Sequence, residues 1–174
     1  NKEGFFEVGI HIADVSDYVK PNTNLDKEAY ERGTSIYLVD RVVPMLPEVL
    51  SNGLCSLRPK EDKYTFSAVF TFNTDGELKK EWYGKTIINS DYRFSYDEVQ
   101  HILETNTTKI NNEISLTSKE YNVPKEVLNA LKILDNQAKK LREKRMKDGA
   151  ISFDRVEVKF ELNKNNKPAK IYFK

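Results

Sequence analysis

The strongest structural constraint in this sequence is an alternating pattern of side chains between residues 64 and 72. Every second position carries an aromatic residue or alanine: Tyr64, Phe66, Ala68, Phe70 and Phe72. Successive side chains of a strand point to opposite faces, so this period predicts a half-buried β-strand. The turn sequence Asn73-Thr74-Asp75-Gly76 follows it and predicts an antiparallel hairpin with residues 77–88.

Two other segments have strand character. Residues 5–12 form a short run rich in apolar side chains, which predicts a buried strand near the start of the chain. Residues 156–162 alternate between apolar and charged side chains, and the alternation resumes at residues 170–173 after a turn rich in Asn, Lys and Pro. This second pattern predicts another hairpin at the end of the chain.

Three segments between the strands have helical signals. We expect helices that begin at Asn24 or Asp26 and end at Gly33, begin at Ser95 or Asp97 and end near Glu104, and run from Pro124 to Gly149. The helices do not alternate strictly with strands, which disfavours a doubly wound sheet. We therefore predict an α+β fold in a single domain, with a mixed or antiparallel sheet of hairpins and helices packed on it.

Composition limits the classes of protein to consider. The 28 basic and 27 acidic side chains leave a net charge of +1, so any surface for a polyanion must be local. The single cysteine, Cys55, excludes an intrachain disulfide and fits a reducing cytoplasm. No apolar stretch is long enough to cross a bilayer, so we expect a cytoplasmic protein without a membrane partner.

The residues alone do not predict a catalytic or metal-binding centre. The carboxylates are scattered, and neither His11 nor His101 has the spacing of a metal-ligand pair. No glycine-rich phosphate loop is present. Aromatic residues near strand ends and six basic residues between Lys139 and Lys147 favour single-stranded nucleic acid, although core packing and a solvated helix face explain them equally simply.

Several ordered motifs carry a family resemblance. Residues 8–16 read Val-Gly-Ile-His-Ile-Ala-Asp-Val-Ser, and residues 32–38 read Arg-Gly-Thr-Ser-Ile-Tyr-Leu. Val-Pro-Met-Leu-Pro and Leu-Ser-Asn-Gly-Leu-Cys-Ser-Leu follow at residues 43–47 and 50–57. Weaker matches occur at residues 94–99 and 149–153. Together they resemble the catalytic RNB domain of the ribonuclease II and ribonuclease R family, most closely bacterial ribonuclease R, over almost the whole chain.

The resemblance implies part of an exoribonuclease that degrades single-stranded RNA processively from its 3′ end with Mg²⁺. The family's cluster of metal-binding aspartates precedes the matched segment, and its catalytic glutamate and arginine follow it. Residues 1–174 are thus expected to be an internal fragment of one RNB domain. We expect the isolated fragment to bind no Mg²⁺ and to be inactive.

The resemblance also assigns recognition residues. Tyr37 resembles the tyrosine that stacks on the terminal base, Phe153 the aromatic that clamps the base stack, and Tyr96 a tyrosine that lines the RNA channel. Asp14 resembles a residue that positions the metal ligands without binding the metal itself. The alternative for each aromatic is core packing, and the alternatives for the chain are a non-catalytic RNA-binding module and a protein-interaction domain.

The expected boundaries have a physical consequence for the first strand. In the family, this strand pairs with the segment that carries the aspartates. Without that segment, one row of its backbone donors and acceptors is unpaired, and such an edge can pair with another chain. We therefore expect a possible homodimer through the first strand.

Overall fold

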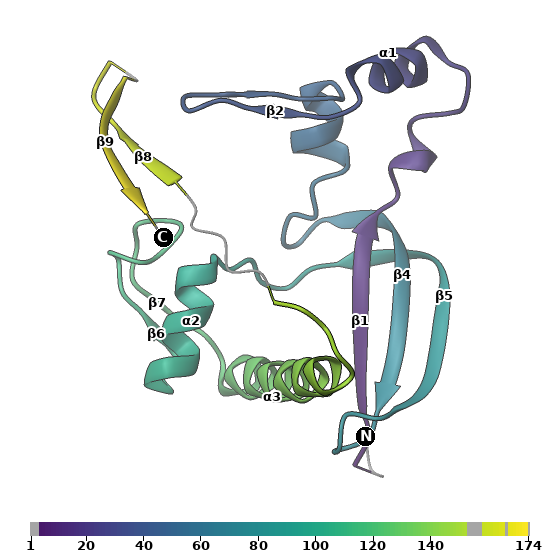
Figure 1. Ribbon diagram of the computed structural model, residues 1–174, viewed down its shortest axis with the longest axis vertical. Coiled ribbons are helices and arrows are strands. Elements are labelled where there is room, and N and C mark those ends of the chain that lie inside the picture. The colour runs from purple at the N-terminus through teal and green to yellow at the C-terminus, as the bar shows by residue number, and fades with distance from the viewer. Residues whose placement is uncertain (1–3, 153–157, 166, 174) are drawn as a thin grey trace.

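The computed structural model describes residues 4–152, 158–165 and 167–173, and its central element is a three-stranded antiparallel sheet (Figure 1). The strands are β1 (Phe6–Ala13), β4 (Asp62–Phe72) and β5 (Leu78–Asn89), in the order β1-β4-β5. The predicted hairpin is confirmed by the pairing of β4 with β5. At its turn, the Asn73 side chain accepts hydrogen bonds from the backbone of Asp75 and Glu77, at 3.1 and 2.8 Å.

Three pairs of short strands complete the β-structure. β2 (Ile36–Tyr37) pairs with β3 (Val42–Val43), and β6 (Lys109–Ile110) pairs with β7 (Tyr121–Asn122). β8 (Val158–Leu162) pairs with β9 (Pro168–Phe173), which confirms the predicted final hairpin. All these pairs are antiparallel. With the helices between them, they confirm the α+β class.

The three predicted helices are present as α1 (Asn24–Arg32), α2 (Tyr96–Thr105) and α3 (Lys125–Lys147). The expected start of α1 is wrong by one residue, because the hydroxyl of Thr23 caps it by accepting from the backbone of Asp26 at 3.3 Å. Gly33 ends α1 with φ of 67°, a conformation that glycine adopts without strain. Pro124 stands immediately before α3 rather than at its first position.

The main hydrophobic core lies between α2, α3 and the short strands β6 and β7. Its buried members are Ile102, Ile110, Val123 and Leu128. Ile102 and Ile110 are fully buried, and each such side chain stabilises the fold by roughly 1.5–3 kcal/mol. Residues 105–122, a segment rich in Asn, Thr and Ser, therefore contribute directly to the core through Ile110 of β6.

The expectation that β1 and the apolar side of β4 would be buried is wrong. Tyr64 and Phe66 are 48% and 51% exposed, whereas Thr65 and Ser67 on the opposite face are fully buried. On β1, Ile10 and Ile12 also face solvent. We call this exposed side, with Ile10, Ile12, Tyr64, Phe66, Tyr83 and Ile87, the apolar face of the sheet.

The buried polar side is stable because its hydroxyl groups bond to one another. Thr65 and Ser67 each bond to the hydroxyl of Thr86, at 2.6 and 2.5 Å, and Ser67 also bonds to His11 Nδ1 at 2.6 Å. Satisfied hydrogen bonds remove most of the penalty for burying hydroxyl groups. His11 thus has a structural partner, as expected for a histidine outside a metal-ligand pair.

Glycines on two strands make room over this polar side. A Cβ atom on Gly9 would lie 2.5 Å from the His11 ring, and one on Gly84 would lie 2.6 Å from the Trp82 ring. Real Cβ atoms do not approach other atoms so closely, so both rings need glycine beneath them. The two rings fold back along their own strands and help to cover the hydroxyl groups.

Candidate RNA-binding site

Tyr37 lies on a hairpin that extends away from α1 (Figure 1). Two hydrogen bonds attach the hairpin to its base: the Ser35 hydroxyl accepts from the backbone of Met45 at 2.9 Å, and Arg32 donates to the carbonyl of Pro44 at 3.2 Å. Tyr37 itself is 78% exposed. Its ring is therefore not packed in a core of this chain, which disfavours the alternative that Tyr37 is a core residue.

Tyr96 is the first residue of α2 and is 96% exposed. The preceding Ser95 fixes this end of the helix through a reciprocal capping box with Glu98. Phe94, two residues earlier, packs against the core. A buried anchor on one side and a capped helix on the other hold the backbone of Tyr96 while its ring faces solvent.

Phe153 lies outside the described residues. The structure therefore describes two of the three aromatic residues that the sequence predicted, and no ring contact joins Tyr37 to Tyr96 in the part of the chain that it describes.

Asp14 follows the end of β1 and is only 7% exposed. Its carboxylate accepts from Lys85 Nζ at 2.8 Å and from the Ser16 hydroxyl at 2.5 Å. These two hydrogen bonds, that from Lys85 first, hold the pKa of Asp14 below its ordinary value. The carboxylate is thus ionised at neutral pH but already neutralised by Lys85.

A metal centre is not formed by the residues that the structure describes. Within residues 4–152, 158–165 and 167–173, no group of three or more His, Cys, Asp or Glu side chains converges to hold an ion. The ammonium group of Lys85 already lies 2.8 Å from a carboxylate oxygen of Asp14, in the position that a bound metal cation would need. Over the same residues, no helix is long and apolar enough to cross a membrane.

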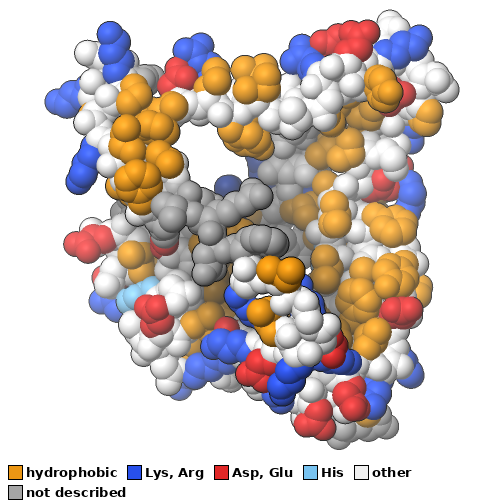
Figure 2. Space-filling model, in the orientation of Figure 1, with side chains coloured by type: hydrophobic (Ala, Val, Ile, Leu, Met, Phe, Trp, Pro, Cys, Tyr) orange, Lys and Arg blue, Asp and Glu red, His pale blue; other side chains and the backbone are white. Residues whose placement is uncertain are grey.

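Two hairpins border an opening in the molecule. Figure 2 shows this opening with hydrophobic side chains along the border formed by β2–β3 and along the border formed by β8–β9. The exposed apolar residues of the two hairpins include Ile36, Tyr37 and Leu38 on one side and Phe160, Ile171 and Phe173 on the other. The two hairpins therefore present flat and branched apolar groups to solvent.

The basic run of α3 is not next to this opening. Figure 1 places α3 at the end of the view opposite β2–β3. Lys139 pairs with Asp135 at 2.6 Å on the same helix, and Lys140 donates to the carbonyl of Thr74 in the β4–β5 turn. Part of the run therefore attaches α3 to the β4–β5 turn.

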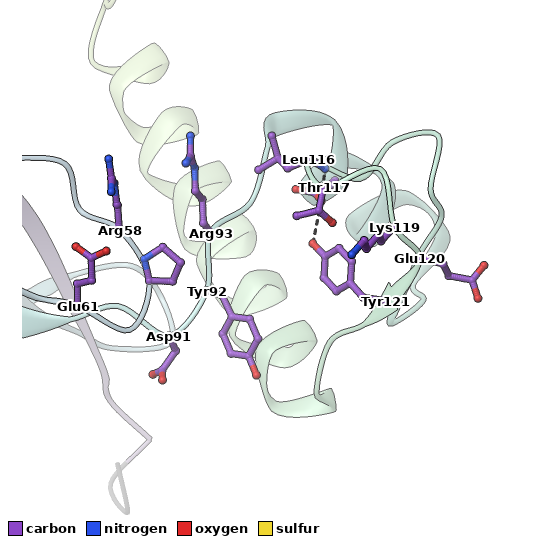
Figure 3. A pocket seen from close by; sticks show the side chains of 12 residues that line it. Arg58, Glu61, Asp91, Tyr92, Arg93, Leu116, Thr117, Lys119, Glu120 and Tyr121 are labelled. Atoms are coloured by element: carbon purple, nitrogen blue, oxygen red, sulfur yellow. Dashed lines mark hydrogen bonds between the residues drawn. The ribbon is translucent and has the colours of Figure 1, made fainter. Parts of the chain in front are cut away.

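A pocket that the sequence did not indicate lies between the base of the sheet and α2 (Figure 3). It has a volume of about 780 Å³ and is lined by residues from three segments, 58–61, 91–98 and 116–121. Arg58 directly follows one family motif and Arg93 directly precedes another. The positions of Arg58 and Arg93 next to these motifs are the sequence signal that could have indicated this pocket.

Glu98 holds the inner wall of the pocket together. It is fully buried and accepts from the backbone of Ser95 at 2.6 Å, from the backbone of Leu116 at 3.1 Å and from the Tyr121 hydroxyl at 2.8 Å. Burial alone would raise the pKa of Glu98, but these hydrogen bonds outweigh it and lower the pKa. Burial, followed by the bond to Glu98, raises the pKa of Tyr121 to about 12.

The chain belongs to the RNB domain family of exoribonucleases, which it matches over residues 1–174. Within this family it is similar to ribonuclease R. It is 39% identical to ribonuclease R 1 of Lactococcus lactis over 170 residues, which are 98% of this chain and 20% of the relative. It is 40% identical to DIS3-like exonuclease 2 of Xenopus tropicalis over 165 residues, 94% of this chain and 20% of the relative.

A solved structure agrees with these relatives. RNase R of Mycoplasma genitalium, in a complex with double-stranded RNA, superposes with a TM-score of 0.83 at 34% identity, over 97% of this chain and 28% of that one. The relatives also include a protein of Arabidopsis thaliana named inactive exonuclease DIS3L2, 36% identical over 95% of this chain and 16% of that relative. The chain spans about a fifth of the length of the curated relatives from Lactococcus lactis and Xenopus tropicalis.

Proposed function

We propose that this chain is the part of a Mg²⁺-dependent 3′-5′ exoribonuclease that grips single-stranded RNA during processive degradation. Tyr37 carries this proposal, because it lies in a family motif and projects 78% exposed from a hairpin that borders the opening. Tyr96 and Phe153 are proposed as further stacking residues.

Stacking suits an enzyme that must hold any sequence. Every base offers an aromatic face, and each base stacked on an aromatic side chain contributes roughly 1–3 kcal/mol to binding. The apolar side chains on β2–β3 and β8–β9 add contact area without reading base edges. A single-stranded RNA held in this way can advance by one nucleotide and then make an equivalent set of contacts.

The residues described here do not fit the Mg²⁺ ion of the proposed reaction. They form no carboxylate cluster, and Asp14 is neutralised by Lys85. We therefore propose that the isolated chain does not cut RNA. Asp14 is proposed as a supporting residue for the metal ligands of the whole protein, so Asp14→Asn should raise the Mg²⁺ concentration required for half-maximal activity there.

A binding experiment tests RNA binding separately from RNA cleavage. Fluorescence anisotropy of a labelled oligoadenylate in EDTA measures the Kd for wild type, Tyr37→Ala and Tyr37→Phe. Loss of one stacked base should weaken binding by about 5-fold to 150-fold, whereas phenylalanine should keep most of the affinity. Tyr30→Ala is the matched control, because Tyr30 on α1 is equally exposed at 88%. Equal Kd values for Tyr37→Ala and Tyr30→Ala would reject the role of Tyr37.

The second candidate is a non-catalytic RNA-binding module on the same scaffold. The relative named as inactive favours keeping this candidate, because its sequence is 36% identical over 95% of this chain. The whole gene product, incubated with 5′-labelled RNA and Mg²⁺, distinguishes the two. A ladder that shortens from the 3′ end supports the exoribonuclease, and tight binding without a ladder supports the module.

A further inference from the structure

We propose that the pocket between segments 58–61, 91–98 and 116–121 is a second RNA-binding site, which holds one nucleotide by its phosphate. This inference rests on the proposed function for its substrate class, but it concerns different residues from the stacking side chains.

The first argument is an imbalance between paired and unpaired charges in the pocket. Its lining includes three cationic side chains, Arg58, Arg93 and Lys119. Within the described residues, none of the three forms an ion pair with a carboxylate. Arg58 donates one guanidinium hydrogen bond to the carbonyl of Asn52, which leaves its other N–H groups free for a ligand.

The carboxylates of the pocket are already engaged elsewhere. Glu61 pairs with Lys63 at 2.7 Å, Asp91 with Lys60 at 2.6 Å, and Glu120 with Lys109 at 2.9 Å. The fourth, Glu98, is enclosed by three hydrogen-bond donors. Three of the four acids pair with lysines outside the cavity, and Glu98 is enclosed by hydrogen-bond donors, so the charged side chains of the lining that have no ion pair among the described residues are positive and favour an anion.

The second argument is the direction of the cationic side chains. Figure 3 shows Arg58 and Arg93 extending in the same direction from the backbone, with Leu116 and Thr117 on the other side of Arg93 from Arg58. Two guanidinium groups that line one pocket suit a phosphate ligand, because each offers a planar fork of N–H donors.

The third argument is that the pocket is not purely polar. Pro59 and Leu116 line it, and Leu116 is half exposed. An inorganic anion would leave these groups in contact with water, whereas the sugar or base of a nucleotide covers them. A volume of about 780 Å³ accommodates such a ligand, since pockets for small molecules are typically about 300–1,000 Å³.

The salt dependence of RNA binding tests this site in the whole gene product. Each phosphate contact to a single strand contributes about 0.7 to the slope of log Kd against log salt concentration. In EDTA, with a labelled oligoadenylate, Arg58→Ala combined with Arg93→Ala should reduce the slope by about 0.7, because one phosphate contact is lost. Lys119→Ala, on the opposite wall, should also reduce it.

Lys27→Ala is the matched control, because Lys27 is an exposed residue of α1 that forms no ion pair in the described structure. An unchanged slope for both pocket variants, equal to that of Lys27→Ala, would overturn the inference. The inference would also be overturned if polyglutamate displaced the RNA as effectively as unlabelled RNA does, because the site would then accept any anion.

The same measurements separate this inference from the proposed function. A loss of affinity in Tyr37→Ala with an unchanged slope in the pocket variants rejects the pocket and keeps the stacking site. A reduced slope in the pocket variants with an unchanged Kd for Tyr37→Ala keeps the pocket and rejects the stacking residue.

Discussion

Glu98→Gln tests whether one buried carboxylate joins α2 to the segment that follows it. In the structure, one oxygen of Glu98 accepts from the backbone of Ser95, and the other accepts from both Leu116 and Tyr121. Glutamine has the same size but only one acceptor oxygen. If that oxygen keeps the bonds to Leu116 and Tyr121, the amide nitrogen must face the N–H of Ser95, and two donors then oppose each other.

The magnitude follows from these three bonds. A buried donor left without a partner costs about 1–3 kcal/mol. The two remaining bonds change from charged to neutral acceptors and weaken by about 1 kcal/mol each. We expect Glu98→Gln to lower the free energy of unfolding by about 3–5 kcal/mol. For a chain of this length, that loss lowers Tm by about 6–20 °C.

Urea denaturation followed by circular dichroism measures this loss, and its pH dependence identifies the cause. The pKa of Glu98 is lowered in the folded state from an ordinary value of 4.5. A lowered pKa stabilises the fold above the unfolded pKa, and this contribution disappears as pH falls through the folded pKa. The difference between wild type and Glu98→Gln should therefore be complete at pH 7 and shrink below about pH 4.5.

Glu104→Gln is the control for this experiment. Glu104 lies on the same helix but is exposed, and among the described residues its side chain bonds only to Gln100. Its substitution should change the free energy of unfolding by less than about 0.5 kcal/mol. A stability of Glu98→Gln equal to that of Glu104→Gln, or a difference from wild type that is the same at pH 7 and at about pH 3.5, would refute the reasoning.

Three further outcomes are expected. Gly33→Ala should destabilise the chain by about 1–2 kcal/mol because φ is 67° at this position, whereas Gly53→Ala, with open space around the added carbon, should have little effect in the same thermal melt. Light scattering at micromolar concentration should give a dimer through the free edge of β1, and the mass of one chain would contradict that expectation. The isolated chain should produce no 3′-5′ ladder from labelled RNA with Mg²⁺ or Mn²⁺, and a clean ladder would show that residues 1–174 suffice for cleavage.

The hairpins and helices could be predicted from the sequence because their signals are local. The period-two pattern of residues 64–72 and the turn after it specify the β4–β5 pairing without any other part of the chain. The same holds for Ser95 with Glu98 and for Gly33, where the residues at the helix end determine the cap.

The buried side of the sheet could not be predicted in the same way. The alternation shows that β4 has two different faces, but not which one is covered. That outcome depends on Thr86 of β5 and on the glycines beneath the rings of His11 and Trp82, which lie on β1 and β5 rather than on β4. A pattern within one strand contains no information about these partners.

The candidate sites also differ in whether their residues lie in one segment of the sequence or in several. Tyr37 and Tyr96 were found because each lies inside a recognisable motif, and their exposure agrees with the proposed role. The pocket with Arg58 and Arg93 was missed, because it is assembled from three separated segments and because its acids and bases balance in the sequence. Only the ion pairs of the folded chain show which charges remain available.

The apolar face of the sheet has a consequence for how stability varies with temperature. The heat capacity of unfolding measures the apolar surface that water gains when a chain unfolds, and about 2–2.6 kcal/mol/K is typical for 174 residues. Side chains such as Ile12 and Phe66 contact water even in the folded chain. They contribute little to that increase, so the measured value should fall below this range. Free energy of unfolding then changes gently between cold and warm conditions, and the stability curve is broad and flat.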